Sequence, residues 1–347
     1  MLIKIGQRAK QFVFANQLVL SFALLSGFLT IIANRSGVGW SWDTSDYVAV
    51  GKNFANGNGL LDATGIPMTV RPPGLSIFIG LGDLLGLSVK LTVQILNSVC
   101  AAVLVLGAHQ LLQIAEVKKS IAVLTTAFIA FSPALLWQYS MIWSEPPFIA
   151  LLIVSMLISL QHMKKLKFVS LIFVFIALFF VRYVGPVFAV TIAVCSAFFD
   201  RRQLGLIKSA LTNFLILVIS LVPVWFWLQR NERIDGTLTG ARSPGGGSLI
   251  DPLKTFNATI GSWLTARPVE GGIYMSWIDY STATRTLGSL FLICLAVLLT
   301  VFIYLQIRNR KLAKLSNVLL LSISMTTVYV AFSAYRFVHF ELGPLDN

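Results

Sequence analysis

The sequence has few charged residues, and they are unequally divided between the two signs. Only 12% of its 347 residues are Asp, Glu, Lys or Arg, while 56% are hydrophobic. A soluble domain carries about 25% charged residues, so most of this surface is expected to face something other than water. Apolar runs of about 20 residues, the length of a membrane-spanning helix, recur along the chain. Lipid offers the backbone no hydrogen-bond partners, and the sequence therefore predicts an all-α, polytopic membrane protein.

Cysteine and histidine are equally scarce, with three residues of each. The cysteines are far apart and lie inside apolar runs, and the histidines share no ligand spacing. This pattern excludes a disulfide or metal framework built on them. We expect the cysteines to be small packing residues: Cys100, Cys195 and Cys294.

The distribution of charge predicts about nine transmembrane helices and their orientation. A charged residue costs about 2.5–3.5 kcal/mol at a helix centre, so charged clusters mark the loops. One set of loops holds 15 basic residues against Glu116 and Asp200, whereas the other 12 basic and 12 acidic residues cancel. The net charge of +13 therefore lies on one side, which the positive-inside rule makes cytoplasmic. The predicted spans lie near 12–34, 89–112, 120–138, 146–162, 167–182, 184–199, 206–228, 286–307 and 315–335.

This topology predicts a plasma (inner) membrane protein with a cytoplasmic N-terminus and a single transmembrane domain over 1–347. The basic excess is a topology signal, so no nucleic-acid partner is expected. Large loops at 35–88 and 229–285 are predicted outside the cytoplasm. Short turns at 139–145 and 182–183 and the C-terminal residues 336–347 are predicted on the same side.

Two short helices are expected in the first external loop. The first covers 46–56, with Asp43, Thr44 or Ser45 as its N-cap and Gly57 after its end. The second, 73–87, is about 15 residues long, too short for a span. If it crossed, every later basic loop would change sides. Both helices are therefore placed at the outer membrane surface.

The first external loop also holds the residues best suited to chemistry. Asp43 and Asp46 are three residues apart, and Arg71 precedes two prolines. A carboxylate at the membrane surface can act as general base for a hydroxyl acceptor, and an arginine can hold a phosphate through its planar fork. A purely structural role is the alternative: Asp43 as N-cap, Asp46 as a first-turn acid, and Arg71 in a rigid turn.

Two further charges lie at outer span ends. Glu145 begins an apolar run, where a carboxylate favours the helix dipole. Arg182 lies almost within an apolar run, where a cation needs a partner or a wet cavity. A partner such as Glu145 or Asp43 would make Arg182 structural, and a bound phosphate would make it functional.

The order of these motifs resembles the GT-C superfamily of polyprenyl-phosphate-sugar glycosyltransferases, which includes protein O-mannosyltransferases and lipid A aminoarabinose transferases. In the first loop the matching residues are Asp43, Tyr47, Gly57, Gly59, Pro72 and Pro73. Further matches are Ser132–Ser140 followed by Trp143–Phe148, and the turn Arg182–Gly185. The resemblance covers 12–200 well and is diffuse beyond.

The resemblance implies a glycosyltransferase that moves a hexosyl or pentosyl group from a polyprenyl-phosphate donor to a lipid, glycan or protein acceptor. It makes Asp43 the catalytic base. Many relatives have a second acid directly after it, where this sequence has Thr44, so Asp46 is a candidate either for that second acid or for a metal ligand. A divalent metal is left open. Arg71 and Arg182 become candidates for the donor phosphate, with supporting roles for Tyr47, Glu145 and Tyr183.

A lipid-linked-sugar flippase or transporter without catalytic activity is the alternative. It predicts polar groups in the middle of several spans, for which Asn97, His109, Asn213 and Thr326 qualify.

Relatives continue beyond the ninth span with an Arg-Tyr element, whereas here Tyr335-Arg336 is reversed and Asn347 follows soon after. We therefore expect a chain truncated at its C-terminus.

Overall fold

The computed structural model describes residues 17–241, 261, 286–290, 293–294, 297 and 317–326. The chain divides into two compact units, residues 1–241 and 242–347. Over the described residues the structure is helical, with two isolated β-bridges and no strand. Unit 1 contains α2 (Gln17–Ala33), α3 (Trp42–Ala55), α4 (Gly74–Leu84), α5 (Val89–Ile114), α6 (Lys119–Ala130), α7 (Pro133–Tyr139), α8 (Glu145–Ser159), α9 (Lys165–Val181), α10 (Gly185–Leu204) and α11 (Leu206–Asp235). In unit 2, Asn317–Thr326 is a short apolar helix.

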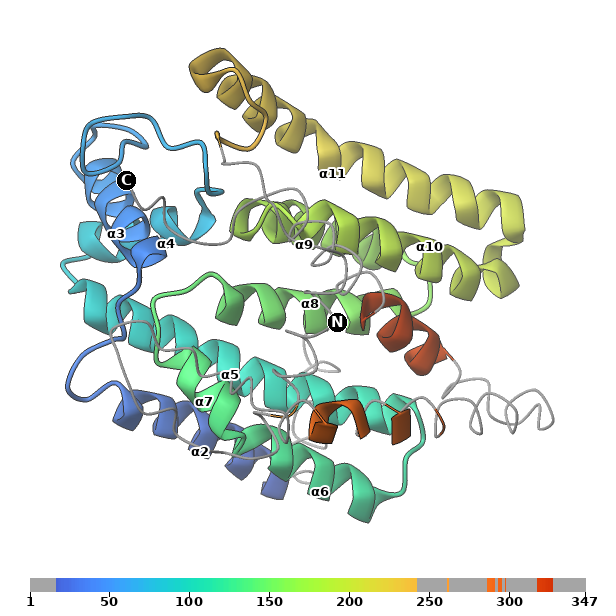
Figure 1. Cartoon of the computed structure of the whole chain (residues 1–347). Coiled ribbons are helices and arrows are strands. Elements are labelled where there is room, and N and C mark those ends of the chain that lie inside the picture. The colour runs from blue at the N-terminus through green and yellow to red at the C-terminus, as the bar shows by residue number, and fades with distance from the viewer. Residues whose placement is uncertain are drawn as a thin grey trace. The chain divides into compact units, whose positions relative to one another are not determined.

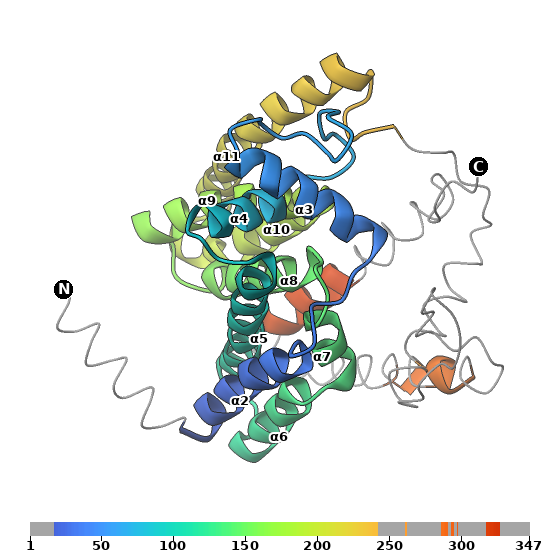
Figure 2. The ribbon, with the colours of Figure 1, turned by 90° about the vertical axis from the view of Figure 1, so that its left-hand side faces the viewer.

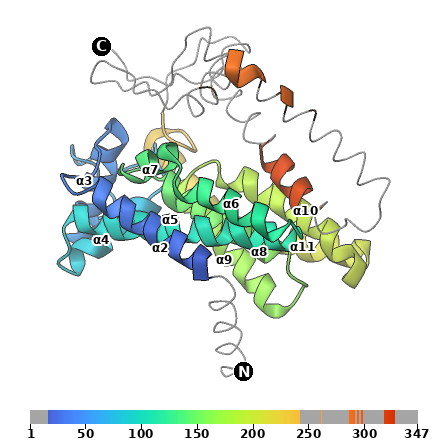
Figure 3. The ribbon, with the colours of Figure 1, turned by 90° about the horizontal axis from the view of Figure 1, so that it is seen from below.

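The long helices of unit 1 run side by side and reverse direction at each connection (Figure 1). α5 packs on α2 and α8, and α9, α10 and α11 pack on one another. α3 and α4 lie together at one end of this bundle (Figures 2 and 3). The connections that hold the acidic and arginine candidates lie at that end. The connections near residues 115–118, 160–164 and 205, where lysine and arginine lie at the adjoining helix ends, are at the opposite end.

Several helices have the composition of membrane-embedded segments. α5 and α11 are each long and apolar enough to cross a membrane, and α6 with α7 is a third such segment if the pair, bent by 46°, is one span. Large apolar side chains are exposed on the outer faces of the bundle, among them Phe128 and Phe214. The all-helical class is thus confirmed for the described residues, and two or three helices that could cross a membrane are consistent with membrane association. Of the nine predicted spans, seven correspond to helical segments of unit 1, and 286–307 and 315–335 fall mostly outside the described residues.

The two short helices predicted in the first external loop are present as α3 and α4, but α3 begins four residues early. Ser41 is its N-cap, and the Thr44 hydroxyl accepts a hydrogen bond from the Ser41 backbone N–H at 3.0 Å. Asp43 is therefore a first-turn residue and not the predicted cap. The Ser41–Thr44 hydroxyl pair starts the helix ahead of the carboxylates. Gly57 follows the helix with a φ of 78°, as expected of a residue that ends it.

Glycines let α3 and α4 approach closely. A Cβ on Gly80 would lie 2.5 Å from the Gly51 carbonyl oxygen, and one on Gly51 would lie 2.8 Å from that of Ser76. A Cβ on Gly74 would lie 2.5 Å from the carbonyl oxygen of Phe180, near the end of α9. Any larger residue at these positions would push the helices apart. The three glycines therefore bring α3 and α4 close together and α4 against the end of α9.

Cys100 and Cys195 are buried and form no disulfide, in agreement with the predicted packing role. Cys100 packs in an apolar cluster with Ala101, Tyr139 and Ala150. Cys294 is also free, and exposed.

A buried ion pair fixes the opposite end of the bundle. The Lys167 ammonium of α9 donates to both carboxylate oxygens of Asp200 of α10, at 2.9 and 2.8 Å. It also donates to the backbone carbonyls of Ser159 and Gln161. Both side chains are almost fully buried, at 0% and 3% exposure. Since a buried charge is tolerated only when it is paired and hydrogen-bonded, this pair holds α8, α9 and α10 in one arrangement.

Replacing only one member of this pair should therefore destabilise unit 1 strongly. Asp200→Ala leaves the ammonium of Lys167 without its counter-ion and should cost about 3–5 kcal/mol. The double variant Lys167→Met with Asp200→Leu should recover most of that loss, because it leaves no buried charge. Unfolding in detergent measures both, with exposed Lys165→Met as the control. Equal destabilisation by the single and double variants would contradict a role for the pair as described.

Candidate functional site

Arg71 forms ion pairs with both candidate carboxylates of α3. Its guanidinium forms ion pairs with Asp46 and with Asp43, the latter at 2.6 Å between Nη2 and Oδ1. One turn of α3 places the two acids on the same face, and the fork of the guanidinium spans them. The side chains of Asp43 and Asp46 are 56% and 42% exposed, against 19% for Arg71. The cation thus lies beneath two carboxylates that face outward.

A second group of contacts adjoins the first. The Tyr47 hydroxyl donates a hydrogen bond to Ser144 Oγ at 3.2 Å, and Arg182 Nη1 donates to the same oxygen at 3.1 Å. Arg182 also forms an ion pair with Glu145. Arg71 lies over the ring of Tyr47, with its guanidinium carbon 5.7 Å from the ring centre. Through Tyr47 and Ser144, the contacts run from the Asp43 carboxylate to the end of α9.

This arrangement bears on the alternatives that the sequence left open. For Arg182 the sequence offered Glu145, Asp43 or a phosphate as partner, and the structure pairs it with Glu145, which is the pairing expected of a structural role. Six of the seven predicted residues lie in this one connected group: Asp43, Asp46, Tyr47, Arg71, Glu145 and Arg182. Four segments of the chain supply them, namely α3, the loop before α4, the start of α8 and the end of α9.

Tyr183 lies in a neighbouring polar cluster. Its hydroxyl donates to the Thr69 carbonyl at 2.5 Å and accepts hydrogen bonds from Trp227 and Asn231 of α11, at 3.0 and 2.9 Å. Asn231 also donates to the carbonyl of Leu238. Tyr183 therefore fixes the loop that leads into Arg71 and supports the site only indirectly.

The same loop has two further anchors on α11. Thr69 donates to Asp235 at 2.5 Å, and Arg230 donates to the carbonyl of Met68 at 3.0 Å. Burial alone would raise the pKa of Asp235, but hydrogen bonds from Thr69 and Thr237 outweigh it and lower that pKa. The anion is thus the favoured form, and the loop before Arg71 stays attached to α11 at neutral pH.

Three of the residues that complete these clusters were missed by sequence reasoning: Ser144, Thr69 and Asn231. Serine, threonine and asparagine are common in loops and helix ends, so their identity carries little signal. Ser144 does have one local sign, since it precedes Glu145 and two prolines at the start of α8. Its partners lie 97 and 38 residues away, and no local pattern reveals such distant contacts.

Asp43 and Asp46 remain the nearest approach to a metal-ligand pair. Among the described residues, no group of three or more His, Cys, Asp or Glu side chains is placed to hold a metal ion. The two carboxylates share the cation of Arg71. A divalent ion at this position would have to replace or join the guanidinium.

The polar residues predicted in the middle of spans make hydrogen bonds inside the protein. Asn97 donates to the carbonyls of Tyr139 and Met141, and His109 contacts Thr126 at 3.0 Å. Asn213 donates to the Ser209 carbonyl and Thr326 to that of Ser322. These contacts describe structural roles and do not outline a polar pathway.

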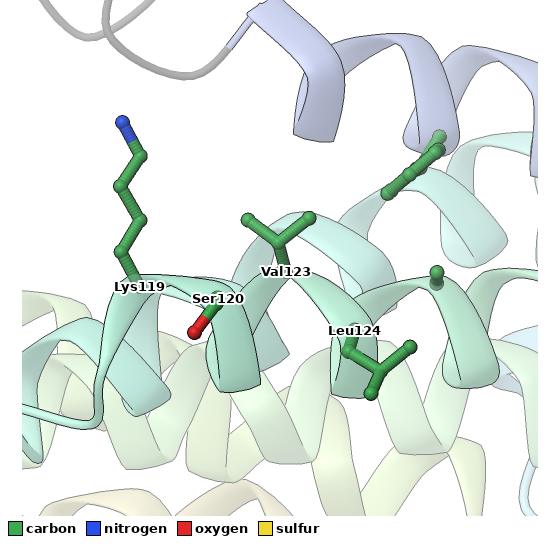
Figure 4. Close-up of a pocket in the computed structure, with 6 residues that line it drawn as sticks. Lys119, Ser120, Val123 and Leu124 are labelled. Atoms are coloured by element: carbon green, nitrogen blue, oxygen red, sulfur yellow. The ribbon is translucent and has the colours of Figure 1, made fainter.

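A groove of about 600 Å³ lies away from the acidic residues, beside α6. Its walls are mostly apolar, and Lys119 is at the end of α6 that faces away from α3 (Figures 1 and 4). None of the described residues that line it is a carboxylate. Its position at the opposite end of the bundle separates it from Asp43 and Arg71.

No protein-family model matches the chain, and no curated protein or solved structure matches it. The likeness to GT-C glycosyltransferases therefore rests on the sequence motifs quoted above. The geometry around Asp43 and Arg71 is an independent observation, because it comes from the fold and not from those motifs.

The buried hydroxyl of Tyr47 should resist ionisation. Burial raises the pKa of Tyr47 above the ordinary tyrosine value of about 10, so the phenol stays neutral where exposed tyrosines lose their proton. In an absorbance titration between about pH 9 and pH 11, Tyr47→Phe should match the wild type in amplitude. A loss of amplitude equal to one tyrosine would show that Tyr47 ionises normally.

Proposed function

We propose that the chain is a membrane glycosyltransferase of the GT-C type, which transfers a sugar from a polyprenyl-phosphate donor to an acceptor outside the cytoplasm. The observation that carries the proposal is the pair of outward-facing carboxylates on α3, held by Arg71 at the end of the bundle remote from the basic loops. The family motifs supply the reaction, and the site supplies residues suited to it.

In the proposed reaction Asp43 is the general base. As the acceptor oxygen bonds to the anomeric carbon of the sugar, Asp43 takes the acceptor proton and the bond to the donor phosphate breaks. The electron pair of that bond leaves with the phosphate. The carboxylate is 56% exposed, so a hydroxyl can reach it, and Arg71 fixes its direction. A base positioned in this way contributes about 10²–10⁴-fold to a rate.

The leaving phosphate needs positive charge more than it needs an acid, because charge accumulates on its oxygens. Arg182 at the end of α9 is the proposed phosphate contact. Its ion pair with Glu145 is partly exposed, at 27% and 33% of the two side chains, so a phosphate can join or replace the carboxylate. Arg71 is the second candidate, and its two carboxylates give it a positioning role as well.

The membrane arrangement completes the proposal. Nine spans in a plasma (inner) membrane would place the N-terminus in the cytoplasm and α3 and α4 at the outer surface. The separation of the basic connections from the acidic residues in unit 1 supports that orientation. The polyprenyl chain would then lie in lipid beside the bundle, with the phosphate at the level of Arg182.

A flippase or transporter is the second candidate. It needs groups inside the bundle that bind a substrate near the bilayer midplane. Asn97 and His109 form hydrogen bonds with neighbouring segments, and Asn213 with Asp200 of α10 and with its own helix. The flippase alternative therefore has less support than the exposed carboxylates give to sugar transfer.

Replacing the proposed base should abolish transfer and leave the fold intact. Asp43→Asn keeps the size of the side chain but cannot take a proton, and it should lower turnover by about 10²–10⁴-fold. The assay uses membranes containing the full chain with polyprenyl-phosphate mannose or glucose and follows the sugar released from the lipid. Asp83→Asn, an exposed acid of α4 in the same loop, is the control. Turnover by Asp43→Asn equal to that of the control would remove Asp43 from the mechanism.

Cysteine labelling should place Asn58 and Lys164 on opposite sides of the membrane. Both side chains are exposed, and the proposed topology puts position 58 outside and position 164 in the cytoplasm. Single cysteines at each position, in a chain without Cys100, Cys195 and Cys294, are treated with an impermeant maleimide on intact cells. Labelling of position 58 alone is expected. Labelling of both positions, or of position 164 alone, would contradict the orientation.

A further inference from the structure

Ser144 occupies the N-cap position of α8, but its side chain makes no capping hydrogen bond to the backbone of that helix. A serine at this position normally accepts hydrogen bonds from the backbone N–H groups two or three residues on. Here those residues are Pro146 and Pro147, and proline has no N–H. The two prolines leave the Ser144 oxygen without its usual local donors.

Other parts of the chain supply those donors. A serine hydroxyl has two acceptor lone pairs, and Ser144 Oγ accepts from the Tyr47 hydroxyl at 3.2 Å and from Arg182 Nη1 at 3.1 Å. Ser144 and Tyr47 are 3% and 4% exposed, so water does not replace either contact. One buried oxygen therefore joins α3, α8 and the end of α9.

We propose that Ser144 is a positioning residue that sets the place of Arg182 relative to Asp43. Tyr47 follows Asp43 by one turn of α3 and lies beneath Arg71, the partner of the Asp43 carboxylate. Ser144 thus acts on both parts of the proposed reaction: it holds the cation for the leaving phosphate and, through Tyr47, the helix that carries the base. This role rests on the proposed glycosyltransferase function.

A double-mutant cycle in the transfer assay tests the role. Ser144→Ala and Tyr47→Phe each remove the Tyr47–Ser144 hydrogen bond, and each should lower kcat/KM by about tenfold, the effect of one ordinary hydrogen bond. Ser144→Ala also removes the hydrogen bond from Arg182, so its loss should be at least as large as that of Tyr47→Phe. Because both variants remove the Tyr47–Ser144 contact, the double variant should lose little more than Ser144→Ala alone. Ser144→Thr keeps the hydroxyl and should restore most of the rate.

Ser155→Ala is the matched control. Ser155 is buried on the same helix, and its hydroxyl donates only to the nearby Leu152 carbonyl in the contacts described, at 2.7 Å. This variant should keep wild-type kcat/KM. Thermal unfolding of every variant separates a misplaced Arg182 from a destabilised fold. If Ser144→Ala does not fold, the kcat/KM of Tyr47→Phe relative to that of Ser155→Ala tests the role of Ser144.

The outcomes separate the two proposals. Wild-type membranes that release no sugar from either polyprenyl phosphate would overturn the glycosyltransferase assignment itself. Wild-type transfer with fully additive losses, or with a Ser144→Ala rate equal to that of Ser155→Ala, would overturn only the role of Ser144. Non-additive losses with recovery in Ser144→Thr would establish it.

Discussion

The end of unit 1 that holds α3 and α4 depends on the pairing of charge beside an apolar bundle. Arg71 neutralises two carboxylates one turn apart, and Glu145 neutralises Arg182. Neither cation could lie so close to buried aromatic and aliphatic side chains without such partners. Tyr47 and Ser144 connect the two ion pairs without adding charge. The same need for pairing explains the opposite end, where Lys167 and Asp200 are buried together.

Local features of the sequence predicted the helices well. The apolar runs predicted α5 and α11 because long runs have few alternatives to a helix in lipid. Gly57 and the two prolines predicted the ends of α3 and the start of α4 within a few residues. The start of α3 was placed too late, because Asp43 is as good an N-cap as Ser41 by residue type, and only the Thr44 hydroxyl decides between them.

The contacts between candidates could not be predicted in the same way. The sequence proposed Arg71 for a phosphate and Asp43 for a proton, but it did not indicate that the two are partners. That pairing depends on how closely α4 approaches α3 and α9, which the glycines at 51, 74 and 80 determine. Likewise the partner of Arg182 depends on the turn before α8. Residue type indicated which side chains could be functional, and the packing of the helices determines which of those side chains contact one another.

The anchors of the loop between α3 and α4 also constrain the order in which the protein can mature during synthesis. Thr69 and Met68 are held by residues 230–235 of α11, which follow more than 160 residues later in the chain. At translation rates of about 5–20 residues per second, α11 emerges on the order of 10–30 s after the loop. During that interval α3 and α4 are already made, but the hydrogen bonds from α11 to the loop between them have not formed. This end of unit 1 therefore stays incomplete until α11 has been made and has packed on the loop.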